Sequence, residues 1–333
     1  MKNLITRYAA LLLIIIVSSC EQERFDAEVE IPNFSFPETN SFDDNLSSYR
    51  IFEGTMADLE PSEGFELLEL SSSLFTDYAH KQRLVKIPEG SSITKLNNGS
   101  LNFPDGTILT KTFFYVNDER DAKLGKRIIE TRLEIKQNGK WNIATYIWNE
   151  SQTDATLELN GSDTEVSWIN EKGILNSTNY HVPTQNECMA CHQSNSQIAP
   201  IGPSLLNLNR NINRNGSVMN QLKHLQSLRI LDDFSLINLP QMVDYTDVNA
   251  SLSERGRAYL AMNCAHCHNP DAWDIPAERD FDFRHKTPFE QTGIQFEKDR
   301  ISRNITNGEM PFIGTTLLDE EGVALLVEYL ESL

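Results

Sequence analysis

The sequence has few cysteines, a shortage of basic residues and no apolar run long enough to cross a membrane. Only five of its 333 residues are cysteine, and 29 lysines and arginines stand against 48 aspartates and glutamates. The formal net charge of −19 at pH 7 excludes binding to nucleic acid or to an anionic bilayer surface through the protein's own field. The length predicts two or three domains, and a hydrophobic content of 39% is enough to build their cores.

The chain begins with a short basic stretch followed by an apolar run at residues 9–17. A membrane-spanning helix needs about 20 apolar residues, so this run predicts a secretory signal peptide at residues 1–19. The small residues before Cys20 resemble the lipobox of bacterial lipoproteins, in which the cysteine is lipidated. We therefore expect an exported lipoprotein, facing the periplasm or the cell surface, that is anchored to the outer membrane through Cys20 and tethered by residues 20–45. An ordinary signal peptide with a chance cysteine is the alternative.

Residues 46–180 show the two-residue periodicity of β-strands. Alternate positions from Ile129 to Lys136 are charged, which predicts a strand with one face in the core and the other in solvent. Asn138-Gly139 predicts a tight hairpin turn that sets Leu133 opposite Ala144. We expect an all-β sandwich or barrel-like domain. It contains no cysteine and a single histidine, so it has no predicted metal or catalytic cluster.

Helix and loop patterns replace the strands after residue 180. Ser251-Leu-Ser-Glu254 is a capping box that opens a helix. A last amphipathic helix is predicted to start around Asp319. We expect two small all-α modules, at residues 181–250 and 251–333, so that the whole chain is an α+β multidomain protein.

Two short motifs carry the chemistry. Each has two cysteines three residues apart and a histidine directly after the second cysteine, which is the pattern for covalent attachment of a c-type haem. Cysteines at this spacing lie on one side of a helical turn, where both can form thioethers, and the histidine then becomes the proximal iron ligand. The motifs are Cys188-Met-Ala-Cys191-His192 and Cys264-Ala-His-Cys267-His268. The sequence therefore predicts two covalently bound haem c groups.

Other uses of the two cysteine pairs fit less well. The pairs of a structural zinc site usually lie about 15–20 residues apart, whereas Cys191 and Cys264 are 73 residues apart in this numbering. A thioredoxin-like dithiol needs a βαβ setting and no following histidine. Free pairs would also oxidise in an exported protein. His266 occupies a spacer position of the second motif, and we expect its ring to face solvent.

The distal ligands are predicted less directly. For the second haem the candidate is Met310, in Glu309-Met310-Pro311, because the order of motif, loop, Met-Pro and final helix resembles class I cytochrome c modules. For the first haem the candidates are Met242 and, for bis-histidine ligation, His224, while Met219 lies too near the proximal loop. An iron with an open site is the remaining alternative.

Beyond the motifs, the chain from about residue 46 resembles a family of uncharacterised bacterial di-haem c-type cytochromes. Matching stretches include Leu74-Phe-Thr-Asp-Tyr-Ala79, Phe103-Pro-Asp-Gly-Thr107 and Pro200-Ile-Gly-Pro203. The last resembles the Gly-Pro loop of class I cytochromes, whose proline carbonyl accepts a hydrogen bond from the proximal imidazole, so both α modules are expected to be class I-like. The resemblance implies electron transfer and, for some members, a neighbouring parallel β-helix protein. Residues 271–276 depart from the glycine-rich loop expected there.

Together these features predict a membrane-anchored di-haem cytochrome that passes electrons to and from exported redox proteins. Two alternatives stay open. One is a di-haem oxidoreductase, a peroxidase or small-molecule dehydrogenase, that uses the first haem as an open catalytic iron. The other is a ligand-binding β-module with attached haems.

Overall fold

The computed structural model describes residues 31, 32, 34, 42–273 and 281–333. The predicted signal peptide at 1–19, Cys20 and most of the predicted tether at 20–45 lie outside them. Every element below belongs to one compact unit, Pro32–Leu333. None of the helices in the described residues has both the length and the apolar character that crossing a membrane requires.

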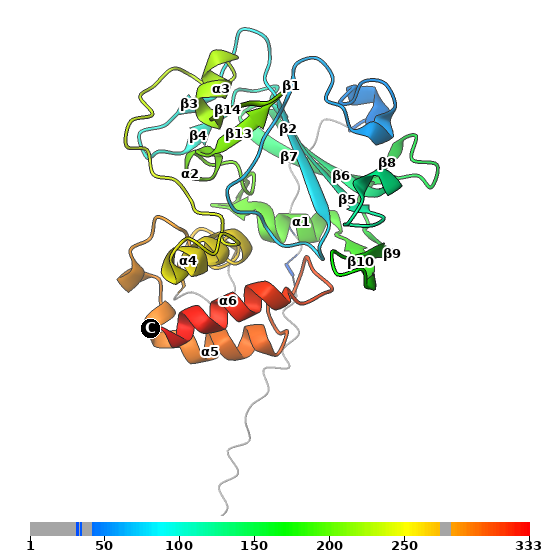
Figure 1. Cartoon of the computed structure of the whole chain (residues 1–333). Helices are drawn as coiled ribbons and strands as arrows, with labels where there is room; N and C mark the ends of the chain where they lie inside the picture. The colour runs from blue at the N-terminus through cyan, green and yellow to red at the C-terminus, as the bar shows by residue number, and fades with distance from the viewer. Residues whose placement is uncertain (1–30, 33, 35–41, 274–280) are drawn as a thin grey trace, which may run out of the picture. The chain divides into compact units, whose positions relative to one another are not determined.

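A six-stranded antiparallel sheet occupies the first half of this unit (Figure 1), with the strand order β1-β2-β5-β6-β7-β8. Its strands are β1 (Phe65–Leu67), β2 (His80–Lys86), β5 (Ile108–Val116), β6 (Lys126–Gln137), β7 (Lys140–Trp148) and β8 (Ala155–Glu158). Two separate hairpins pair β3 (Thr94–Lys95) with β4 (Leu101–Asn102), and β9 (Ser162–Ile169) with β10 (Leu175–Val182). Short 3-10 helices lie at η1 (Leu46–Tyr49), η2 (Met56–Asp58) and η3 (Ala122–Leu124).

The sheet confirms the predicted hairpin and excludes one of the two predicted forms, the closed barrel. Gln137 pairs with Lys140 across Asn138-Gly139, and Leu133 lies opposite Ala144. Asn138 and Gly139 have φ values of 51° and 74°, the left-handed pair that a tight hairpin turn needs. Within the described residues β1 and β8 form open edges of the sheet. The region is therefore β-rich and antiparallel as predicted, but the sheet does not close into a barrel.

Both faces of the sheet are buried. One face carries an apolar cluster that includes Leu84, Leu133 and Tyr146, and it is covered by the segment around η1. The opposite face shares a second cluster with residues far along the chain, including Cys188 and Leu222. Glu130, Arg132 and Glu134 of β6 lie on this second face with little exposure, so the expectation that they face solvent is wrong.

Residues 181–250 pack directly on this second face. They form α1 (Gln185–His192), α2 (Leu205–Leu208) and α3 (Gln221–Ser227), together with two hairpins, β11 (Gln193–Ser194) with β12 (Gln197–Ile198) and β13 (Asn211–Arg214) with β14 (Ser217–Asn220). The sequence predicted an all-α module here, and the two hairpins show that this prediction is wrong. The helices of this region are short because their apolar residues complete the core of the sheet instead of building one of their own.

The last part of the chain is helical. Its elements are α4 (Leu252–Asn263), η4 (Phe289–Gln291), α5 (Ile294–Thr306) and α6 (Glu320–Glu331). The predicted capping box is present, since Ser251 caps α4 and Glu254 bonds back to it. Helix α6 packs against α4 and α5 around an apolar cluster that includes Leu260, Ile301 and Leu326. In this region the prediction of a helical module is confirmed.

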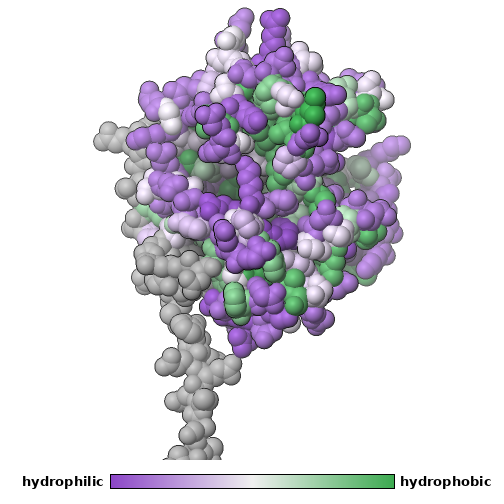
Figure 2. Space-filling view, turned by 90° about the vertical axis from the view of Figure 1, so that its left-hand side faces the viewer, coloured by the Kyte–Doolittle hydropathy of each residue, from purple (hydrophilic) through white to green (hydrophobic). Residues whose placement is uncertain are grey.

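The surface agrees with the acidic composition. Figure 2 shows one face covered mostly by hydrophilic side chains, with hydrophobic side chains in smaller groups between them. Isolated exposed apolar residues of this kind are normal on a globular protein.

Candidate haem sites

The first motif lies on a short capped helix. The Thr184 side chain accepts a hydrogen bond from the backbone N–H of Glu187, whose carboxylate accepts one from the N–H of Thr184. This capping box starts α1, so the two cysteines and His192 all lie within about two turns. Burial raises the pKa of Cys188 to about 12. The helix therefore presents both thiols and the imidazole to one region of the interior.

His192 has the surroundings of a prepared iron ligand. Its Nδ1 lies 3.0 Å from the carbonyl oxygen of Ala199, a contact that fixes Nδ1–H as the donor and leaves Nε2 for a metal. Burial, and then the charge of Lys111, lower its pKa well below the usual value, so the imidazole is neutral, as ligation requires. The accepting carbonyl belongs to Ala199 and not to Pro203, so the resemblance identified the right loop but the wrong residue.

A charged band crosses the sheet face beneath this helix. Arg83, Lys111 and Arg132 lie in one row across β2, β5 and β6, with Glu130 and Glu134 beside them. Glu130 is fully buried and holds Arg132 through two hydrogen bonds, of 2.6 and 2.8 Å. Oε1 of Glu134 lies 3.9 Å from Nδ1 of His192. The charges of β6 thus surround the first motif.

Burial shifts the ionisation of this charged band. It raises the pKa of Glu134, although the charges of Lys111 and Arg132 oppose the shift. It also lowers the pKa of Lys111, against the charge of Glu134. A small cavity adjoins these groups and is lined by Arg83, Lys111, Glu134, Leu68, Leu70, Ile201 and Pro203, among others. The charged band therefore borders this small, largely apolar cavity.

The second motif begins where α4 ends. The N–H of Cys264 still bonds to the carbonyl of Leu260, and the N–H of His268 bonds to that of Cys264 at 2.8 Å. The His268 ring packs against Phe281 and Phe283, with ring centroids 5.7 and 5.4 Å away. Burial, followed by the charges of His266 and Arg300, lowers the pKa of His268 to about 4. This imidazole is also neutral at physiological pH.

The two motifs meet. Sγ of Cys191, Sγ of Cys267 and a ring nitrogen of His266 all lie within 4.8 Å of one another. A hydrogen bond with Cys267, together with burial, raises the pKa of Cys191 well above its usual value. His266 is partly buried in this contact, so the expectation that its ring faces solvent is wrong. A structural zinc site takes four such donors, and the described residues bring three together here.

The structure places the predicted distal ligand Met310 in the apolar cluster of the last region. This cluster also contains Cys264, Phe281 and Phe283, and the two phenylalanines contact His268. Met310 thus packs against the same small core as the second motif.

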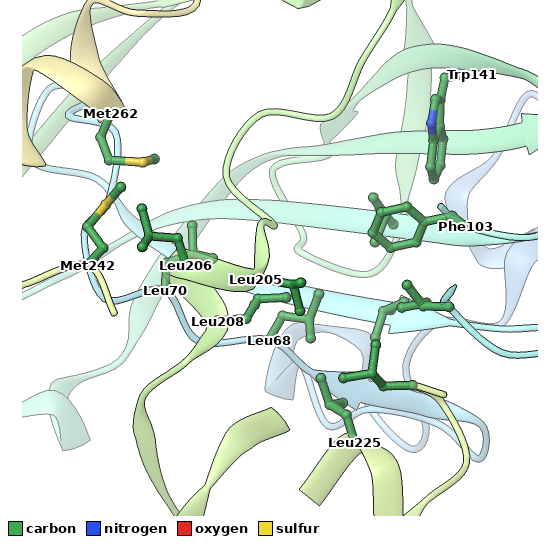
Figure 3. Packing of buried hydrophobic residues seen from close by; sticks show 14 of the residues in the cluster. Leu68, Leu70, Phe103, Trp141, Leu205, Leu206, Leu208, Leu225, Met242 and Met262 are labelled. Carbon is green, nitrogen blue, oxygen red and sulfur yellow. The ribbon is translucent and has the colours of Figure 1, made fainter. Parts of the chain in front are cut away.

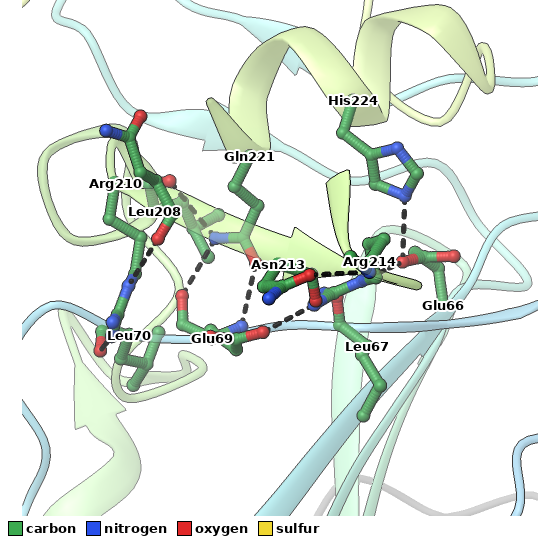
Figure 4. Close-up of polar contacts among 12 residues, drawn as sticks. Glu66, Leu67, Glu69, Leu70, Leu208, Arg210, Asn213, Arg214, Gln221 and His224 are labelled. Atoms are coloured by element: carbon green, nitrogen blue, oxygen red, sulfur yellow. Dashed lines mark hydrogen bonds and ion pairs between the residues drawn. The ribbon is translucent and has the colours of Figure 1, made fainter. Parts of the chain in front are cut away.

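The candidates for the first distal ligand have different surroundings. His224 lies in a polar network, with its Nε2 3.1 Å from Oε1 of Glu66 (Figure 4), so this nitrogen is already engaged. Met242 is buried in the cluster that contains Cys188. Figure 3 shows Met242 and Met262, from α4, pointing toward one another. Met262 is buried, and its sulfur accepts a hydrogen bond from the amide of Asn207 at 3.2 Å.

Comparison with known proteins adds one match. The cytochrome c family matches residues 253–333. This cytochrome c region contains the second motif, Met310 and α4 to α6, and it supports a c-type cytochrome with covalently bound haem and haem-based electron transfer in general. The match does not include Cys188, Cys191 or His192. No curated protein and no solved structure matches the chain.

Several residues around these sites escaped prediction. Ala199 and Met262 are ordinary apolar residues in the sequence, and nothing in their spacing marks them. Glu130 and Glu134 did carry a signal, because two acids and an arginine alternate on one strand face, but that pattern also describes a solvated face. Only the packing of residues 181–250 on the sheet distinguishes the two.

Proposed function

We propose that the chain is a di-haem c-type cytochrome for electron transfer, with one haem at each motif. Cys188 and Cys191 would bind the first group and His192 its iron. Cys264 and Cys267 would bind the second, with His268 and Met310 as axial ligands. A bound haem supplies a one-electron iron couple, and a thioether ligand favours a higher potential than a second histidine does.

The observation that carries the proposal is the contact between the motifs. Cys191 and Cys267 come from different motifs, yet their sulfur atoms are neighbours. Attachment sites this close favour direct exchange of electrons between the two centres. A single-haem cytochrome would have no use for a second motif buried against the first.

The charged band supports a haem at the first motif. A haem carries two carboxylate side chains, which need cationic partners in a protein interior. Arg83 and Lys111 line a small cavity together with Glu134, which lies near His192. Arg83 also donates to Ser73, and Arg132 is held by Glu130. An otherwise acidic chain therefore offers two partly buried cations where two carboxylates would have to be held.

The cellular setting belongs to the same proposal. The short apolar run and the small residues before Cys20 support export and lipidation, with the outer membrane as the site of anchoring. Donors and acceptors would be exported redox proteins, and the acidic surface favours basic partners. A neighbouring parallel β-helix protein is a further candidate partner, from the family resemblance alone.

Haem counting tests the proposal most directly. The full chain, produced with haem-maturation machinery, is expected to carry two haems, and Cys188→Ala/Cys191→Ala and Cys264→Ala/Cys267→Ala are each expected to carry one. Chains that hold zinc, or a wild type with a single haem, would overturn the di-haem proposal.

Ligand variants test the axial assignments. Met310→Ala is expected to remove the far-red charge-transfer band of methionine-ligated ferric haem at the second site and to let that ferrous haem bind carbon monoxide. His224→Gln, the control, is expected to leave both haems unchanged because Glu66 holds its ring. Carbon monoxide binding by the wild type would instead favour an oxidoreductase with an open iron.

A further inference from the structure

One loop of the β-rich region reaches the cytochrome c region on two sides. The loop Ser73–Ala79 leads into β2 and contains the stretch Leu74-Phe-Thr-Asp-Tyr-Ala79, to which the sequence assigned no chemistry. We name it the bridging loop. Its contacts fall into two sets, one to the sheet and one to the last residue of α4 and the segment after Met310.

The sheet holds the bridging loop in place. Nζ of Lys81 donates to the carbonyl of Leu74 at 2.5 Å, and Nη2 of Arg83 donates to Oγ of Ser73 at 2.8 Å. The hydroxyl of Tyr115 donates to the carbonyl of Asp77 at 2.7 Å. Asp77 and Tyr78 have φ values of 49° and 64°, which residues other than glycine hold only where surrounding contacts fix them. The loop is therefore a rigid extension of the sheet.

Asp77 binds the segment that follows Met310. Its carboxylate accepts hydrogen bonds from the backbone N–H of Thr316 at 2.9 Å, from the Thr316 hydroxyl at 2.8 Å and from the N–H of Leu317 at 2.9 Å. The side chain of Asp77 is buried, with Asp77 only 2% exposed. Charge-assisted hydrogen bonds in a buried setting are the strong ones. The hydroxyl of Thr178 in β10 makes a further hydrogen bond with the Thr316 hydroxyl, with 2.8 Å between the two oxygens.

The same loop also binds next to the second motif. The N–H of Phe75 donates to Oδ1 of Asn263 at 2.7 Å, and Asn263 directly precedes Cys264. Asn263 donates in turn to the carbonyl of Tyr259 in α4. One rigid loop thus fixes both the attachment side of the second site and the segment on its Met310 side.

We propose that Asp77 is a positioning residue for the second haem site and that it sets the distance between Met310 and His268. This rests on the proposed function, in which these two residues are the axial ligands. Thr316 lies six residues after Met310, so fixing Thr316 and Leu317 limits how far the methionine can move away. The β-rich region thereby gains a role, which is to hold the distal loop of the cytochrome c region.

The test compares Asp77→Asn with Asp105→Asn in the full haem-loaded chain. The control also removes a carboxylate that accepts a backbone N–H, that of Gly139, but in a turn of the β-rich region. Asp77→Asn is expected to weaken the far-red methionine–iron band and to allow carbon monoxide to bind one ferrous haem. Amides of residues 310–318 are expected to exchange about tenfold faster. Asp105→Asn is expected to change none of these.

Further variants separate the possible failures. Thr316→Val removes the two hydrogen bonds of the Thr316 hydroxyl, to Asp77 and to Thr178, but keeps both backbone N–H bonds to Asp77. It is expected to give a smaller shift in the same direction even if Asp77→Asn folds poorly. If Met310→Ala leaves the band unchanged, the ligand assignment is wrong and the role of Asp77 falls with it. If Met310→Ala removes the band while Asp77→Asn and Thr316→Val preserve it, the positioning proposal alone is wrong.

Discussion

The two motifs share a spacing but have opposite surroundings. The first lies on a short helix against a sheet, among buried arginine, lysine and glutamate side chains. The second follows a longer helix and packs on Phe281 and Phe283 of an apolar cluster, with Arg300 over the Phe281 ring. His192 is bound to a backbone carbonyl, whereas the ring of His268 is confined by aromatic contacts.

If both motifs bind haem as proposed, this difference means that the same ligation chemistry is supported in two physical ways. Charges close to the first iron would act on its potential through electrostatics, which are strong in a buried setting. Around the second site, exclusion of water and the distal thioether would dominate. The family match covers only the second motif. Helices α4 to α6 there form a core of their own, whereas the helix of the first motif shares its core with the sheet.

The largest expected effect comes from breaking the charged band. Glu130→Gln leaves Arg132 without its bidentate carboxylate partner and weakens the acceptor of the Tyr180 hydroxyl, 2.7 Å away. Removing one partner of a buried ion pair typically costs about 3–5 kcal/mol. We expect a loss of that order in the free energy of unfolding, measured by urea denaturation with tryptophan fluorescence.

The matched control is Glu150→Gln, which removes the partner of Arg127 in an exposed pair 3.3 Å apart. It is expected to stay within about 1 kcal/mol of wild type. Hydrogen exchange is expected to show α1 opening before α6 in Glu130→Gln. Equal losses in the two variants would mean that the charged band does not support the first site.

A middle-sized effect is expected from overpacking the second region. A Cβ added to Gly256 of α4 would lie 2.5 Å from ring atoms of Tyr329 in α6, far inside van der Waals contact. Gly256→Ala is therefore expected to destabilise the cytochrome c region by about 1–3 kcal/mol, although alanine favours helix. Ala324→Val, on the exposed side of α6, is the control and is expected to have little effect. In Gly256→Ala, the absorption bands of the second haem are expected to broaden while those of the first haem stay unchanged.

The sequence predicted the local features of this fold well. The hairpin at Asn138-Gly139, the capping box at Ser251 and the amphipathic last helix all depend on residues close together in the chain. Prediction from the sequence failed where segments that are distant in the chain share one hydrophobic core. The alternating charges of β6 look the same whether they meet water or a buried helix, so the second buried face was missed, and with it the mixed structure of residues 181–250.

In the candidate sites, too, the sequence indicated the residues of local motifs and missed the contacts between distant segments. The cysteines and histidines of both motifs were predicted because haem attachment needs them at fixed spacing. Ala199, Asp77 and the contact between Cys191 and Cys267 were not, because each joins parts of the chain that only the tertiary structure brings together. His266 shows the limit most clearly, since its position between two cysteines says nothing about what lies opposite.

The smallest expected effect is a pH dependence confined to the first motif. Burial alone would lower the pKa of His181, but its hydrogen bonds to Asp163 and Glu187 raise it above the usual value. Since the folded protein favours protonated His181, this contribution is fully present below a pH of about 6.5 and is lost as the pH rises through the folded pKa. His181 is one-third exposed, so solvent screening limits the effect to less than about 1 kcal/mol.

Wild type is expected to lose protection of the α1 amides between pH 5.5 and pH 8, about the range in which histidine titrates, while α4 amides do not change. His181→Gln should remove this dependence, and His80→Gln, which breaks a similar pair with Glu119, should preserve it. If His181→Gln still loses protection of the α1 amides as the pH rises, a group other than His181 causes the pH dependence.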